Sequence, residues 1–88
     1  MFVGKVVGSI VSTRKNEKLI GSKFMIVESV MDGSKEKLVA VDNVGAGIGE
    51  IVLVATGSAA RLCCKLSDAP IDAAIVGIVD SGVGLSGV

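Results

Sequence analysis

The sequence predicts an all-β fold: a small five-stranded OB-like β-barrel with one short helix, in a chain that associates with other copies of itself. Five short segments are rich in Val and Ile and are separated by glycine-rich or polar turns, which is typical of short strands. Only one segment, after Ser58, has the pattern of a helix. With 88 residues the chain is long enough for one small domain. Short strands in this number favour a small barrel.

The predicted strands are the apolar stretches of the chain, and turn signals separate them. Polar residues 13–22 form the first loop, and the Asp32–Gly33 pair predicts a hairpin turn. A glycine-rich loop covers 43–49, and Pro70 lies in a turn over 67–72. Ser58 is the expected N-cap of a helix over 59–64. The strands are expected at residues 2–12, 23–31, 37–42, 50–56 and 73–80.

Residues 1–80 are therefore expected to form the domain, and the Gly, Ser and Val residues of 81–88 are expected to form a flexible tail. The close spacing of Gly4 and Gly8 inside the first strand predicts bends or close backbone approach there.

Apolar residues occupy both faces of the last two strands. On the fourth strand Ile51, Leu53 and Ala55 alternate with Val52, Val54 and Thr56. A lone barrel needs an apolar inner face only, so the outer faces are expected to pack on the helix or on a neighbouring subunit. No run approaches the ~18 apolar residues of a spanning helix, and no signal peptide is visible, which predicts a cytoplasmic chain without a membrane partner.

The charge and residue inventory argues against an enzyme. Nine basic and nine acidic residues balance, and the chain has no His, Trp or Tyr. Phosphate backbones are bound through excess positive charge and aromatic stacking, so we expect no nucleic-acid partner. The absence of His and of a grouped ligand set predicts no metal and no cofactor. An OB-type module that binds a nucleic acid or a small metabolite stays the alternative.

Two glycine-containing segments are candidate sites. Gly45, Gly47 and Gly49 do not form the dinucleotide fingerprint, because Glu50 stands where its last glycine belongs, and a tight turn with positive φ or close approach is the favoured interpretation. The segment Gly57–Arg61 lacks the Lys-Ser/Thr pair of a phosphate loop. Arg61 either pairs with a carboxylate across an interface or is solvated, and the spacing leaves both open.

The remaining reactive or charged residues have ordinary interpretations. Adjacent Cys63 and Cys64 rarely bridge without strain and are expected to be reduced thiols. The cluster of Arg14, Lys15 and Lys18 is diluted by Glu17 and is expected to be a solvated loop.

Several motifs, in order, resemble the EutN/CcmL family of bacterial microcompartment vertex proteins, and the resemblance covers residues 1–80. They are the opening Gly4–Gly8 with Val11–Thr13, then Val41–Glu50, Val52–Val54, Gly57–Arg61 and Pro70–Asp80.

The resemblance implies an OB-like barrel that assembles as a ring oligomer, a homopentamer, without catalytic residues. Such pentamers plug the vertices of a polyhedral shell that is otherwise tiled by hexameric shell proteins and encloses metabolic enzymes. On this basis Gly45, Ala46 and Gly47 are expected in a tight loop near a subunit contact or a five-fold pore, with Gly47 the position that excludes a Cβ. Ser58 and Arg61 are expected at a subunit contact.

Overall fold

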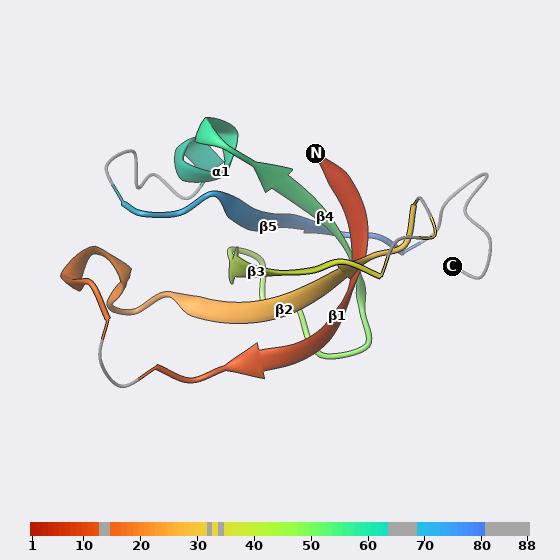
Figure 1. Ribbon diagram of the computed structural model, residues 1–88, viewed down its shortest axis with the longest axis horizontal. Helices are drawn as coiled ribbons and strands as arrows, with labels where there is room; N and C mark the ends of the chain where they lie inside the picture. The colour runs from red at the N-terminus through yellow and green to blue at the C-terminus, as the bar shows by residue number, and fades with distance from the viewer. Residues whose placement is uncertain (13–14, 32, 34, 64–68, 81–88) are drawn as a thin grey trace.

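The computed structural model describes residues 1–12, 15–31, 33, 35–63 and 69–80. Within them five strands close a barrel in the order β1-β2-β3-β5-β4 (Figure 1). Neighbouring strands run antiparallel except β3 and β5, which are parallel. The strands are β1 (Phe2–Ile10), β2 (Lys23–Ser29), β3 (Lys37–Asp42), β4 (Ile51–Thr56) and β5 (Ala73–Ile78), with the helix α1 (Ser58–Cys63) between β4 and β5. The predicted fold class is confirmed.

The predicted element boundaries are wrong by one or two residues at several ends. The first, second and fifth strands each end two residues earlier than predicted, and the fourth begins one residue later. Backbone hydrogen bonds between neighbouring strands continue past the end of β5: the N–H of Val79 donates to the Ile51 carbonyl at 2.8 Å. The loop over 13–22 contains a single 3-10 turn, Glu17–Leu19, where the Asn16 side chain accepts from the N–H of Lys18.

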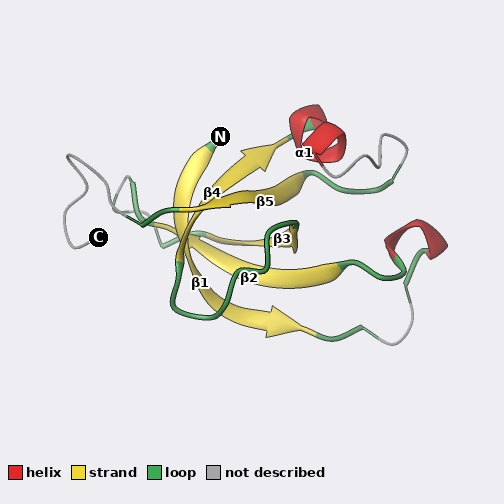
Figure 2. Cartoon of the chain, turned by 180° about the vertical axis from the view of Figure 1, so that it is seen from behind, coloured by secondary structure: helices red, strands yellow, loops and turns green. Residues whose placement is uncertain are grey.

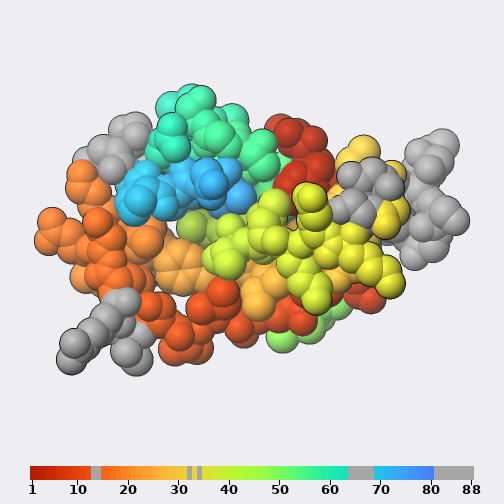
Figure 3. All heavy atoms as spheres, in the orientation of Figure 1, coloured from red at the N-terminus to blue at the C-terminus, as the bar shows by residue number. Residues whose placement is uncertain are grey.

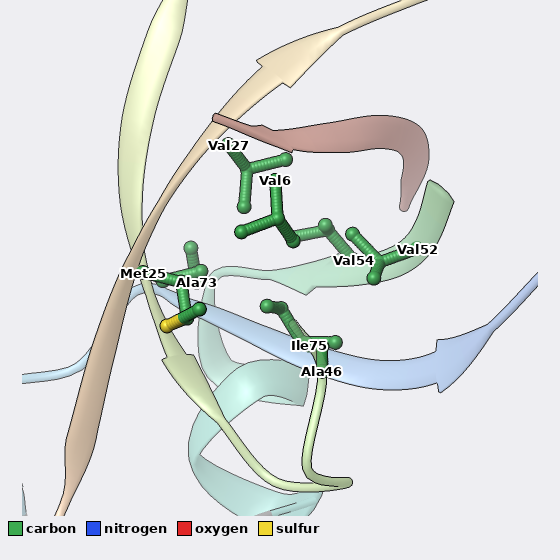
Figure 4. Close-up of a cluster of buried hydrophobic side chains, with 9 residues drawn as sticks. Val6, Met25, Val27, Ala46, Val52, Val54, Ala73 and Ile75 are labelled. Atoms are coloured by element: carbon green, nitrogen blue, oxygen red, sulfur yellow. The ribbon is translucent and has the colours of Figure 1, made fainter. Parts of the chain in front are cut away.

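The core of the barrel is built from residues that alternate inward along the strands. On β4, Val52 and Val54 face inward, while Ile51 and Leu53 are only partly buried, so the predicted alternation is confirmed over these four residues. It is wrong at the end of the strand, where Ala55 is buried and Thr56 is exposed, next to a register shift between β4 and β5. Figure 4 shows the inward side chains meeting from all sides of the barrel. The largest fully buried side chains are Val6, Met25, Val27, Val52, Val54 and Ile75. Each such side chain contributes about 1.5–3 kcal/mol of burial free energy.

A second apolar cluster covers the outer face of β5. Ala74, whose side chain points away from the barrel interior, packs with Ala60 of α1 and with Val41 of β3. This confirms, for β5, the expectation that the helix covers an outer face that the sequence makes apolar.

Glycine at position 4 is required by close packing between β1 and β2. A Cβ there would collide with a methyl group of Val27 and come within 3.0 Å of the Glu28 carbonyl oxygen. Farther along β1 the register with β2 shifts between Val6 and Gly8, which is a β-bulge. The prediction of close approach and bending in this strand is confirmed.

Candidate functional site

The loop between β3 and β4 begins with a carboxylate that holds three backbone amides. One oxygen of Asp42, Oδ1, accepts from the N–H groups of Val44, Gly45 and Ala46 at 3.1, 3.1 and 3.2 Å. The Asp42 side chain is 2% exposed, and its other oxygen lies 3.9 Å from the Lys23 ammonium. Because a charged acceptor binds N–H groups more strongly than a neutral one, Asp42 fixes the first half of the loop.

A second carboxylate and strand β1 hold the other half of the loop. The N–H of Gly47 donates to Oε1 of Glu50 at 2.6 Å. The N–H of Gly49 donates to the Val6 carbonyl at 2.8 Å, and the N–H of Val6 donates to the Glu50 carbonyl at 2.9 Å. Figure 2 shows the loop, in green, passing from the end of β3 toward β1. The loop therefore continues the β1–β4 ladder and is anchored at both ends.

Between these two anchors the loop contributes a side chain to the core. Ala46 is buried and belongs to the cluster inside the barrel. Figure 4 shows Ala46 beside Ile75 of β5. Val44 and Ile48, two residues to either side, are exposed. The buried Ala46 therefore holds the loop against the barrel core, while the apolar side chains of Val44 and Ile48 face outward.

The glycine requirement in this loop falls on Gly45 and Gly49. Their φ angles are +82° and +95°, in the left-handed region that side chains with a Cβ rarely adopt. Gly47 is not in that region, and a Cβ there would meet only Oε1 of Glu50 at 3.4 Å. The prediction of a tight positive-φ turn is confirmed, but the choice of Gly47 as the position that excludes a Cβ is wrong. Sequence spacing gave no means of telling the three glycines apart.

Helix α1 begins one residue earlier than predicted. Gly57, with φ of +64°, turns the chain out of β4, and Ser58 is already the first helical residue. The predicted N-cap role of Ser58 is therefore wrong, because the residue that precedes the helix is Gly57. The N–H of Gly57 donates to the Asp72 carbonyl at 2.8 Å, which fixes the start of the helix beside the start of β5.

Arg61 binds a backbone carbonyl within its own chain. Its Nη1 donates to the carbonyl of Ile71 at 2.9 Å, and the residue is half-buried. Arg61 is therefore more than a solvated side chain, since it ties α1 to the segment that leads into β5. Nearby, the Asn43 side-chain amide donates to the Cys63 carbonyl at 3.2 Å. This bond joins the start of the glycine loop to the end of α1, so the structure brings the two predicted segments together.

The remaining candidate groups are the possible metal ligands, the two phenylalanines and the cysteines. Within the described residues, no three His, Cys, Asp or Glu side chains lie together in a group that could hold a metal ion. Phe2 and Phe24 are half-buried and pack against the two apolar clusters. Cys63 is an exposed free thiol. Cys64 and Arg14 lie outside the described residues, as does the predicted tail over 81–88.

Among the residues that the structure describes, no helix is long and apolar enough to cross a membrane. The Lys15 ammonium donates to the Ser12 carbonyl at 2.8 Å.

The organising roles of Asp42 and Glu50 were not predicted. An acidic residue directly before a glycine-rich loop is the signal that could have indicated the first of them, because Asp side chains commonly accept from amides two residues on.

Comparison with known proteins identifies one family along most of the chain. The family model described as "Ethanolamine utilisation protein EutN/carboxysome" matches residues 1–80. The microcompartment shell vertex protein GrpN of Rhodospirillum rubrum is 50% identical over 86 residues, covering 92% of this chain and 94% of the relative. The shell vertex protein PduN of Salmonella typhimurium is 44% identical, covering 92% and 97%.

Solved structures agree with the sequence relatives. The pentameric microcompartment shell protein GrpN from Rhodospirillum rubrum superposes with a TM-score of 0.82 at 50% identity, covering 94% of this chain and 98% of that one. The structure of CcmL from Nostoc sp. PCC 7120 has a TM-score of 0.88 at 42% identity, with 97% and 95% covered. Both similarities extend over nearly the full length of each pair.

Proposed function

Because the chain belongs to the EutN/CcmL family, we propose that five copies assemble into a ring that caps the vertices of a bacterial microcompartment. The chain is a structural shell vertex protein and not an enzyme, in keeping with its relatives. With them it belongs to a microcompartment shell, which lies in the cytoplasm. The observation that carries the five-fold ring is the full-length similarity to a shell protein solved as a pentamer.

The geometry of a closed shell explains why such a subunit is needed. Hexagonal tiles alone form a flat sheet, and a polyhedron closes only when pentagons are inserted. A vertex subunit must therefore fit among hexameric shell proteins without deforming. A closed barrel has no free sheet edge that could pair with other chains. The loop over 43–50, held by Asp42 and Glu50, adds rigidity to one surface of this barrel.

The predicted interface or pore residues retain that role in this proposal. Gly45, Ala46 and Gly47 lie in the anchored loop, and Ser58 and Arg61 lie on α1. The Asn43–Cys63 bond supports treating the loop and the helix as parts of one rigid surface. No cofactor, nucleic acid or membrane enters the proposal, and the balanced charge of the chain favours none of them.

Electron microscopy of shells tests the proposal. The hexameric shell proteins of the same microcompartment would be co-expressed with or without this chain. With the chain we expect closed polyhedra, and without it elongated or open shells. Closed polyhedra of normal shape in its absence would contradict the vertex role.

A further inference from the structure

The chain leaves β2 in a turn that brings a thioether sulfur onto β1. The N–H of Val30, just past the end of β2, donates to the Val3 carbonyl at 3.1 Å, as one half of an antiparallel pair. The N–H of Val3 faces the same neighbour, and it donates to Sδ of Met31 at 3.2 Å. The Met31 sulfur therefore stands where the backbone acceptor of the second half of that pair would be.

A serine at the end of β2 directs the chain into this turn. Ser29 is the ladder partner of Gly4, and its Oγ accepts from the N–H of Met31 at 3.4 Å. Hydroxyl side chains commonly accept from the amide two residues on, which bends the backbone. The position of the Met31 sulfur is thus set both by the turn and by the hydrogen bond from Val3.

The same side chain is open to solvent. Met31 is 58% exposed, compared with 73% for Met1 and 2% for Met25. In the space-filling view the yellow segment that follows β2 lies at the surface, beside the red start of β1 (Figure 3). Met31 therefore combines access for a dissolved reagent with a defined hydrogen bond at its sulfur.

The hydrogen bond makes the two sides of the sulfur different. A thioether sulfur has two lone pairs and is a weak hydrogen-bond acceptor. In Met31 one lone pair faces the N–H of Val3, so the other is the one turned toward the solvent. Oxygen that is added at one lone pair or at the other gives opposite epimers of methionine sulfoxide, because the oxidised sulfur is chiral.

We propose that Met31 is a reversible oxidation site, at which a hydroperoxide delivers oxygen from the solvent side of the sulfur and forms one sulfoxide epimer in excess. The sulfur loses two electrons to the peroxide: an S–O bond forms and the O–O bond breaks. The departing hydroxide takes the proton of the transferred oxygen and leaves as water. Reductases that are specific for each epimer return methionine sulfoxide to methionine. The inference goes beyond the proposed vertex role and does not rest on it.

Partial oxidation of the purified protein by hydrogen peroxide tests this inference. Peptide mapping should show sulfoxide at Met31 and Met1, and far less at Met25, which the barrel shields. The digested peptides are then treated with one or the other of the two epimer-specific reductases. One enzyme should repair the Met31 sulfoxide roughly threefold more than the other, a ratio that a weak hydrogen bond supports. The two enzymes should repair the Met1 sulfoxide equally.

Two controls isolate the contribution of the Val3 N–H. Val3→Pro removes this donor without removing a bond to β4, because the N–H of Val3 faces the end of β2. Met31 should then give both epimers equally. Oxidation of the wild-type protein in urea should also give equal epimers, and this control does not require a variant to fold.

Three results would overturn the inference. They are equal epimers at Met31 in the folded wild-type protein, an excess that persists in either control, and oxidation of Met31 as slow as that of Met25. Native mass spectrometry of the same samples before oxidation tests the ring separately. A pentamer in which Met31 fails these tests would leave the proposed function standing.

Discussion

Asp42 is expected to be the most important polar residue of the β3–β4 loop, so its removal should cost far more stability than removal of an exposed carboxylate. In Asp42→Ala, three backbone N–H groups lose their shared acceptor. Their geometry decides how much each loss matters. The Ala46 N–H is part-buried and cannot be fully rescued by water, whereas those of Val44 and Gly45 are exposed.

The magnitude follows from this difference. Leaving the sheltered Ala46 N–H without its charged acceptor costs about 1–3 kcal/mol, and each exposed bond adds about 0.5 kcal/mol. The Lys23 contact is 3.9 Å long and its lysine is 62% exposed, so it adds nothing measurable. The total is about 2–4 kcal/mol, a large part of the roughly 5–15 kcal/mol that stabilises a small domain.

Urea unfolding followed by far-ultraviolet circular dichroism measures the change, because the chain has no Trp or Tyr for fluorescence. All variants are compared at one protein concentration, since assembly raises apparent stability by mass action. Asp80→Ala removes an exposed carboxylate and should lie within about 0.5 kcal/mol of wild type. Asp42→Asn keeps one acceptor oxygen and should fall between the two. Equal stability of Asp42→Ala and Asp80→Ala would refute the reasoning.

Three further predictions concern the backbone and α1. Gly45→Ala should lose about 1–2 kcal/mol in denaturant unfolding because of its positive φ, whereas Gly47→Ala should lose less, and a reversed order would contradict the loop assignment. Gly4→Ala should lower the yield of folded protein, since its Cβ meets Val27; a folded variant of wild-type stability would refute this. Arg61→Ala should destabilise the chain by about 1–3 kcal/mol, and Arg61→Lys should restore little of it; full rescue by lysine would mean that the guanidinium geometry is unimportant.

The strands could be predicted from the sequence because their apolar residues alternate with a period of two. Strand β4 shows this pattern: the structure places Val52 and Val54 on one face, and Ile51 and Leu53 on the opposite face. The packing of α1 on the outer face of β5 was predictable for the same reason, because that face is also apolar. Strand ends were less predictable, because pairing continues beyond a strand, as at Val79, without a change in residue type.

The details of the candidate site depend on contacts between residues far apart or on backbone angles. Gly45, Gly47 and Gly49 look alike in sequence, and the backbone angles of the folded chain show that Gly45 and Gly49, but not Gly47, have positive φ. The intrachain bond of Arg61 to Ile71 spans ten residues and depends on how α1 lies against the start of β5. Residue type and spacing left open whether Arg61 pairs with another group or is solvated, and neither indicated the Ile71 carbonyl as its partner.

The mass of the purified wild-type protein tests the central claim most directly. Native mass spectrometry, supported by sedimentation equilibrium, should give about 44 kDa, five times the 8.8 kDa of one chain. The ring should persist at micromolar concentration, because an isolated barrel would leave its outer apolar residues exposed to water. A mass of 8.8 kDa under these conditions, or a closed ring with a number of chains other than five, would contradict the account.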